Sequence, residues 1–109
     1  WLMEAAVGEV YNVAVSHGEG RFIASEEMLK QLAAAGQIAT QYVDLEGNPS
    51  SDVRYNPNNS YDAIEGITSP DGRIFGKMAH CERSGHGLYQ NVTGNKMQDI
   101  FSGAVRYFR

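Results

Sequence analysis

The order in which strand-like and helix-like segments alternate is the feature that most limits how this chain can fold. The first patterns are a β-branched run over residues 9–15, a glycine-rich segment over residues 16–20 and a helical pattern over residues 25–35. A second strand-like run occupies residues 37–44. This order of strand, loop, helix and strand is typical of α/β domains, so we expect an α/β fold.

Local signals fix both ends of the predicted helix. Ser25 is a favourable N-cap, because its hydroxyl can accept a hydrogen bond from an unpaired amide of the first turn. Gly36 follows the pattern and can adopt the left-handed conformation that ends many helices. The apolar residues that we expect on one stripe of the helix are Met28, Leu29, Leu32, Ala33 and Ala35.

A long loop and a hairpin are expected next. Residues 46–60 are rich in Asn, Ser, Pro, Gly and Asp and show no periodicity, which predicts a loop. The sequence Ser-Pro-Asp-Gly-Arg at residues 69–73 is a strong turn signal. It predicts a hairpin whose strands cover residues 63–68 and 73–79.

The end of the chain has the clearest helical pattern. Asn95, with Gln98 three residues later, resembles a capping box and predicts the start of this helix. We expect its apolar stripe to be part of a core. The residues that recur at helical spacing are Met97, Ile100, Phe101, Ala104, Val105 and Phe108.

Composition excludes several classes of protein. The 109 residues are 42% hydrophobic, enough for a core, and their net charge of −4 argues against nucleic acid or an anionic membrane as the main partner. No apolar run approaches the length of a membrane span. The one cysteine, Cys81, cannot form an internal disulfide and indicates a reducing compartment, so we expect a cytoplasmic protein. The chain begins with Trp1, and we expect residues 1–109 to be a single segment of a longer protein.

His80 and Glu82 are the residues whose spacing best suits catalysis. In an extended segment they point the same way, so the Glu82 carboxylate can reach one imidazole nitrogen and leave the other free to act as a base. A surface ion pair has the same spacing, and the pattern alone leaves that alternative open. Cys81 lies between them and we interpret it as structural. The other histidines, His17 and His86, lack metal-ligand spacing, so no metal site is expected.

Several segments, in this order, resemble the glutaminase domain of the phosphoribosylformylglycinamidine synthases, which are class I glutamine amidotransferases. The resemblance covers most of residues 1–83 and extends to the tail. The segments that carry it are residues 16–22 (SHGEGRF), 36–39 (GQIA), 42–44 (YVD), 56–60 (NPNNS) and 64–83 (IEGITSPDGRIFGKMAHCER).

The resemblance implies the C-terminal half of a flavodoxin-like amidotransferase domain that hydrolyses glutamine with a Cys-His-Glu triad. His80 falls on the triad histidine and Glu82 on the acid that orients it. Ser16, His17 and Gly18 fall on the loop that holds the main-chain groups of glutamine. The ammonia would pass to a synthetase domain that uses ATP and magnesium to make formylglycinamidine ribonucleotide in purine biosynthesis. No cofactor is expected in this chain.

Two departures from the family matter. The family nucleophile lies upstream of the SHGEGRF loop, so this segment is expected to lack the triad thiol and to be inactive alone. Relatives usually have proline where this chain has Cys81. We also expect the separate segment to expose apolar surface and to self-associate, through Val10, Val13, Phe75 or the terminal helix.

Two alternative functions remain open at this stage. Another class I amidotransferase, such as GMP synthase, shares the Ser-His-Gly and His-x-Glu features, although SPDGR and GEGRF suit it less well. A non-catalytic interaction module would make the pair of His80 and Glu82 incidental.

Overall fold

The computed structural model describes residues 1, 7–16, 18, 20–83, 90, 94–96 and 98–109. Two compact units make up the chain. The terminal unit consists of Trp1–Ser16 and Ala79–Arg109, and the central unit consists of His17–Met78.

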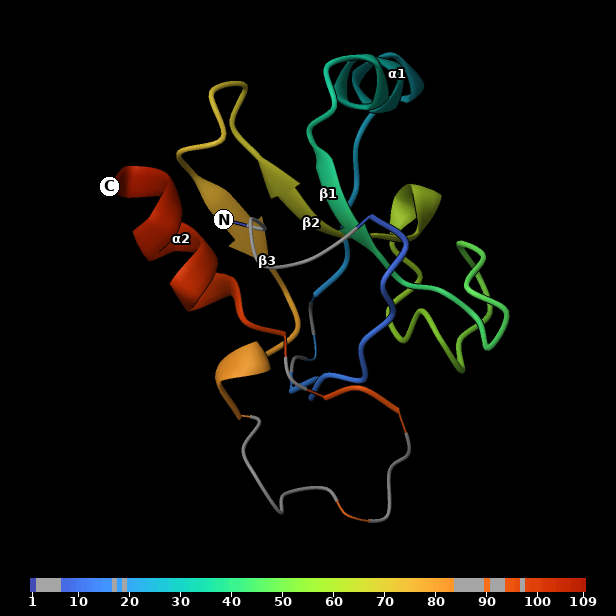
Figure 1. The fold of residues 1–109 in the computed structure, drawn as a ribbon. Helices are drawn as coiled ribbons and strands as arrows, with labels where there is room; N and C mark the ends of the chain where they lie inside the picture. Colours follow the sequence, from blue (N-terminus) through green and yellow to red (C-terminus); the bar gives the residue numbers. More distant parts are fainter. Residues whose placement is uncertain (2–6, 17, 19, 84–89, 91–93, 97) are drawn as a thin grey trace. The chain divides into compact units, whose positions relative to one another are not determined.

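The central unit is built around a three-stranded antiparallel sheet in the order β1-β2-β3. Its strands are β1 (Ile38–Gln41), β2 (Ile64–Thr68) and β3 (Phe75–Lys77). Figure 1 shows them side by side, with β2 in the middle. The first three residues of β2 are buried, as expected for the middle strand of a small sheet.

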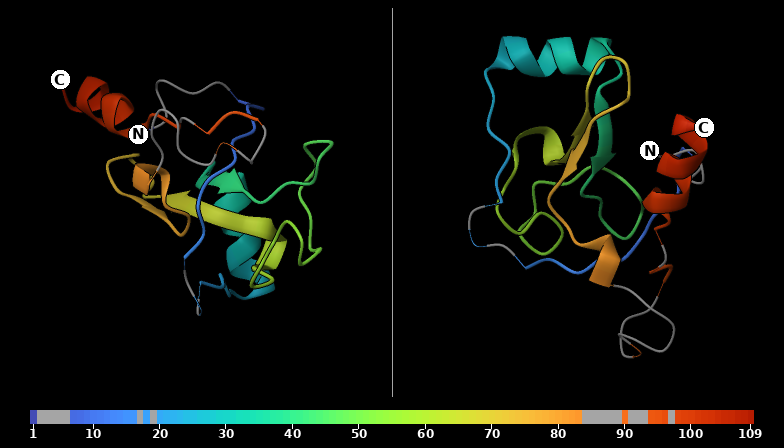
Figure 2. Two further views of the ribbon diagram at one scale, coloured as in Figure 1. Left: turned by 90° about the horizontal axis from the view of Figure 1, so that it is seen from below. Right: turned by 90° about the vertical axis from the view of Figure 1, so that its left-hand side faces the viewer.

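Helix α1 (Glu26–Ala34) lies at the end of the sheet where β1 starts, as Figures 1 and 2 both show. Ser25 caps it as predicted, since its hydroxyl oxygen accepts from the amide of Met28 (3.2 Å), and Gly36 has the expected positive φ of 68°. Of the predicted apolar stripe, Leu32 is buried and Leu29 is half-buried, whereas Met28, Ala33 and Ala35 are exposed.

The hairpin forms around the predicted turn. Ser69 donates its amide to the carbonyl of Ile74 (2.9 Å), and Gly72 has a φ of 72°. The Asp71 carboxylate accepts from the Ser69 hydroxyl (2.7 Å) and from the amide of Arg73, and these bonds lower the pKa of Asp71. The second strand is shorter than predicted and ends at Lys77.

The predicted loop over residues 46–60 has one side chain with no solvent exposure, that of Asn56. Its amide nitrogen donates to the carbonyls of Ser50 (3.2 Å) and Ser60 (3.1 Å), and its oxygen accepts from the amide of Ser60 (2.9 Å). A short 3₁₀ turn, η1 (Tyr61–Ala63), then leads into β2. The loop is therefore organised around one buried amide.

The predicted strand over residues 9–15 is wrong. Ala14 forms an isolated antiparallel bridge with His80, and the amide of Asn12 donates to the carbonyl of Asn95 (2.7 Å). These two contacts are to different segments and do not form the continuous ladder that a strand needs; Val10 and Val15 are exposed.

The terminal helix starts later than predicted. Helix α2 (Ile100–Phe108) is capped by Asp99, whose carboxylate accepts from the amide of Ser102 (3.1 Å). Asn95 is not the cap, because the helix begins only at Ile100; the carbonyl of Asn95 instead accepts from the amide of Asn12 (2.7 Å) within the terminal unit. Met97 lies outside the described residues.

The apolar stripe of α2 is only partly buried. Ile100 and Ala104 are buried as predicted, whereas Phe101, Val105 and Phe108 are exposed. These exposed side chains agree with the prediction that the terminal helix leaves apolar surface exposed. Self-association of the chain itself stays a prediction, which light scattering would test.

Candidate active site

The main chain at His80 is held by a segment far away in the sequence. The amide of His80 donates to the carbonyl of Ala14 (2.8 Å) in the antiparallel bridge between these residues. Directly afterwards the chain turns through a 3₁₀ helix, η2 (Cys81–Arg83). His80 is therefore itself a paired position and is followed directly by a tight turn, both within the terminal unit.

The side chains of His80 and Glu82 are in contact. Nδ1 of His80 lies 2.6 Å from Oε1 of Glu82, and the two side chains are 31% and 51% exposed. A carboxylate only accepts, so this contact requires a proton on Nδ1 and leaves Nε2 unprotonated in the neutral ring. The geometry supplies an oriented imidazole whose second nitrogen can accept a proton.

This contact forms differently from the way the spacing suggested. We expected an extended segment, but Glu82 belongs to the turn η2, so the turn and not a strand brings its carboxylate to His80. Cys81, between them, is a free thiol and is buried. Burial of this thiol agrees with its structural interpretation.

The predicted glutamine-binding loop is described only in part. Ser16 and Gly18 are exposed, and His17 lies outside the described residues, as does His86. Ser16 follows two residues after Ala14, the bridge partner of His80. The start of the predicted loop is thus joined closely, along the chain, to the residue that pairs with the histidine.

No three His, Cys, Asp or Glu side chains of the described residues are grouped so that they could hold a metal ion. Within the same part of the chain, no helix has the length and apolar character needed to cross a membrane.

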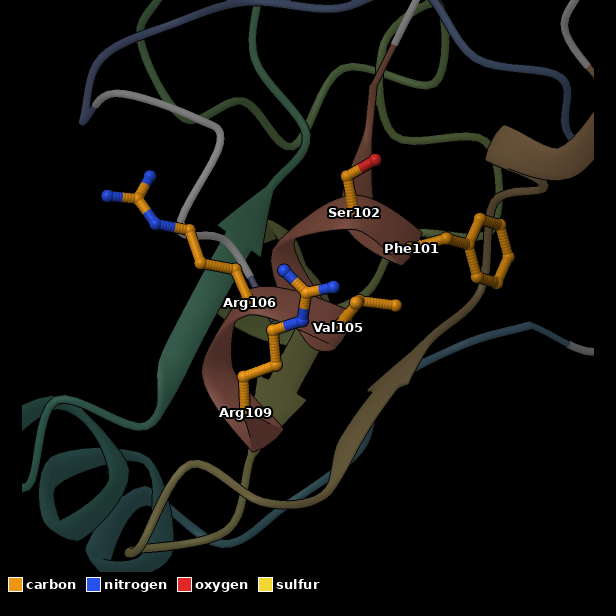
Figure 3. Close-up of a pocket in the computed structure, with 5 residues that line it drawn as sticks. All are labelled: Phe101, Ser102, Val105, Arg106 and Arg109. Atoms are coloured by element: carbon orange, nitrogen blue, oxygen red, sulfur yellow. The ribbon is translucent and has the colours of Figure 1, made fainter.

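The hollow drawn in Figure 3 is not lined by His80 or Glu82. Its lining comes entirely from the side of α2 and the residue that follows it, so it is a shallow helix face and not an enclosed pocket. The residues that line it are Phe101, Ser102, Val105, Arg106 and Arg109.

A buried polar cluster that the local sequence patterns did not predict lies on the sheet of the central unit. Glu65 of β2 and Lys77 of β3 form an ion pair (Oε1 to Nζ, 3.3 Å) whose side chains are only 7% and 10% exposed. The hydroxyl of Thr40 donates to the other carboxylate oxygen of Glu65. The signal for this cluster is the lone charge of Glu65 in the apolar run of β2.

Tyr42 adds a second buried polar group near this cluster. Burial and, to a smaller extent, the negative charge of Glu65 raise the pKa of Tyr42 to about 12. Its hydroxyl is buried and has no hydrogen-bond partner among the described residues.

Comparison with known proteins identifies the family. Residues 1–108 match the CobB/CobQ-like glutamine amidotransferase domain. The chain is 46% identical over 118 aligned positions to the phosphoribosylformylglycinamidine synthase subunit PurQ of Methanococcus maripaludis, covering 91% of this chain and 43% of that protein. It is 38% identical over 90 residues to the subunit PurQ of Chlorobaculum parvum, covering 83% of this chain and 35% of that protein.

A third relative has similar coverage. The subunit PurQ of Thermomicrobium roseum is 37% identical over 84 residues, which are 77% of this chain and 35% of that protein. The chain therefore spans well under half the length of these relatives. Because the family match covers nearly every residue, the chain belongs to the CobB/CobQ-like glutamine amidotransferase domain family.

Proposed function

We propose that the chain is the histidine-bearing, C-terminal half of the glutaminase of a phosphoribosylformylglycinamidine synthase. The half-domain would belong to a class I amidotransferase with a flavodoxin-like fold. Glutamine is its substrate, and the ammonia is used for ATP-dependent conversion of formylglycinamide ribonucleotide to the amidine in the cytoplasm.

One observation carries the proposal: the 2.6 Å contact between Nδ1 of His80 and Oε1 of Glu82. A glutaminase of this kind needs an imidazole whose tautomer is fixed, so that Nε2 can take a proton from a thiol. The names of the relatives support the assignment to this synthase, since all three are PurQ subunits of phosphoribosylformylglycinamidine synthases.

The roles of the two side chains follow from ordinary acid–base chemistry. Nε2 of His80 accepts the thiol proton as the thiolate attacks the carboxamide carbon of glutamine. The resulting imidazolium returns that proton to the departing nitrogen, which leaves as ammonia while a thioester remains. Water then hydrolyses the thioester to glutamate. Throughout, the Glu82 carboxylate holds Nδ1–H and stabilises the positive charge on the ring.

The thiol and the synthetase are assigned outside this sequence, whereas part of the glutamine site is assigned within it. The thiol comes from another segment, because Cys81 is buried in the turn between the two catalytic side chains. ATP and magnesium belong to the synthetase, which is the partner that receives ammonia. Ser16, His17 and Gly18 are proposed to hold the main-chain groups of glutamine.

The experiment is the substitution His80→Ala in the full-length gene product together with its synthetase. Glutamine-dependent synthesis should fall by a factor on the order of 1,000 or more, because the thiol loses its base. Ammonia-dependent synthesis should be unchanged, because it bypasses the glutaminase. Loss of both activities would show that His80 is structural and would contradict the proposal.

A further inference from the structure

Helix α2 carries apolar side chains on two of its sides. Ile100 and Ala104 are buried within the terminal unit, whereas Phe101, Val105 and Phe108 are 57%, 59% and 51% exposed. The three exposed residues are spaced by four and then three positions, so they form one stripe along the helix. A helix that is apolar beyond the face it already buries is typically covered by a second element.

The stripe has the composition of a docking surface. Phe101 and Val105 line the shallow hollow of Figure 3 together with Ser102, Arg106 and Arg109. Apolar side chains bordered by hydroxyl and guanidinium groups resemble the apolar centre and polar rim of protein interfaces. An open hollow of this kind suits a protein segment with apolar side chains better than a small ligand, which needs an enclosing cavity.

The first residue of the sequence lies at one end of this stripe. The indole ring of Trp1 meets the ring of Phe108 edge-on, with 6.1 Å between the ring centroids, and both residues belong to the terminal unit. Figures 1 and 2 show the N-terminal end of the chain beside α2. The stripe from Phe101 to Phe108 is about 10 Å long, which about three extended residues span. A segment joined to Trp1 therefore starts within reach of the whole stripe.

The relatives have enough additional chain to cover this stripe. The matched part is 43% of the Methanococcus maripaludis subunit and 35% of the Chlorobaculum parvum subunit, so more than half of each protein lies outside it. The family resemblance puts the nucleophile before the SHGEGRF segment. The thiol-bearing segment is thus the one that would be joined to Trp1.

A second copy of the chain fits the stripe less well. The nine residues of α2 make a face about 14 Å long, which offers on the order of 200 Å². Each partner of a specific complex contributes roughly 800 Å². A segment of the same polypeptide needs less area, because the covalent link gives it a high effective concentration.

We propose that the exposed stripe of α2 is the docking face for the segment that precedes Trp1 in the full-length gene product and carries the thiol. This inference rests on the proposed glutaminase function. The pair of His80 and Glu82 belongs to the same unit as α2. A segment docked on α2 is therefore held on the unit that contains the catalytic base.

Thiol labelling of the full-length gene product tests whether the stripe is covered. Val105→Cys should react with a water-soluble maleimide at least about 10-fold more slowly in the native protein than in urea, because burial protects a side chain from reagents in solution. Val53→Cys is the matched control and should show little protection, since Val53 is 69% exposed in the long loop. If Val105→Cys does not fold, Ser102→Cys, which lines the same hollow, replaces it. Weaker protection than this at the helix overturns the proposal.

Photochemical cross-linking identifies what covers the stripe. With p-benzoylphenylalanine in place of Phe101, mass spectrometry should find a cross-link to residues that precede Trp1 in the same polypeptide. A cross-link to a second copy, to the synthetase or to residues that follow Arg109 overturns the proposal. The lack of any cross-link to the upstream segment also overturns it.

Glutamine hydrolysis is measured in parallel, so that the two proposals can fail separately. Hydrolysis that survives H80A overturns the proposed function. An unprotected stripe in an enzyme that H80A inactivates overturns the docking face alone and leaves the glutaminase intact.

Discussion

The imidazole of His80 is held at Nδ1 by Glu82, 2.6 Å away, in a turn that begins directly after the histidine. The backbone amide of the same residue is held by the carbonyl of Ala14. Two independent contacts therefore constrain this residue, one on its side chain and one on its main chain. Both lie within the terminal unit.

The substitution Glu82→Gln tests the side-chain contact. A neutral amide can present its NH₂ group to Nδ1 and favour the wrong tautomer, and it does not stabilise the imidazolium. In the full-length gene product, we expect glutamine hydrolysis to fall on the order of 100-fold or more, measured as glutamate release. Glu46→Gln, at an exposed carboxylate of the long loop, is the matched control and should leave the rate unchanged. Equal effects of the two substitutions would argue against the assigned role.

Gly66 is the position of the sheet that tolerates a side chain least. A Cβ there would lie 2.5 Å from Oγ1 of Thr40 and 3.0 Å from Cε2 of Phe75. Gly66→Ala should therefore lower the free energy of unfolding by about 1–3 kcal/mol in urea denaturation. At Gly76, on the neighbouring strand, a Cβ would meet nothing within 4 Å. Gly76→Ala should change stability by less than about 0.5 kcal/mol, and a similar loss at both positions would contradict the packing argument.

Asn56 organises the long loop through three hydrogen bonds, and its substitution should lower the free energy of unfolding. Asn56→Ala leaves the carbonyls of Ser50 and Ser60 and the amide of Ser60 without this partner, so we expect a loss of about 2–3 kcal/mol. Asn48→Ala, at an exposed site in the same loop, is the control and should be near neutral.

Asn56→Asp should make the stability of this loop depend on pH. A carboxyl group facing two carbonyls in a buried site has a folded-state pKa above its unfolded value of about 3.9. Such a group is tolerated below about pH 4, where it is protonated in both states, and becomes destabilising as the pH rises through its folded pKa. Urea denaturation from acid to neutral pH measures the difference from wild type, and a difference independent of pH would contradict the prediction.

Local signals predicted the features that depend on neighbouring residues. The cap at Ser25, the positive φ at Gly36 and the turn at residues 69–73 require only short-range chemistry, and all three are confirmed. The contact of Glu82 with His80 is also short-range, although a turn forms it instead of a strand.

Features that depend on distant partners could not be predicted from local patterns. The run over residues 9–15 has strand-like residues, but Ala14 forms an isolated bridge and no continuous ladder follows, since pairing depends on where other segments lie. Asn95 has the sequence of a cap, yet the helix begins only at Ile100 and the carbonyl of Asn95 is bound to the amide of Asn12. The cluster around Glu65 needs three strands in one register, which a linear pattern does not reveal.

Tyr42 should make the stability of the central unit fall at alkaline pH. Its pKa is raised from 10.0 to about 12, chiefly by burial and secondly by Glu65. Above about pH 10 the unfolded chain loses this proton while the folded chain keeps it, so the free energy of unfolding decreases as the pH rises from about 10 to 12. Tyr42→Phe removes the titrating group and should reduce this decrease.

Because the buried hydroxyl has no partner among the described residues, Tyr42→Phe should also stabilise the chain at neutral pH by about 1 kcal/mol. Tyr61→Phe, at an exposed ring, is the control that should do neither. Urea denaturation of the three proteins between about pH 7 and 11 measures both effects, and an unchanged alkaline slope in Tyr42→Phe would show that another group controls it.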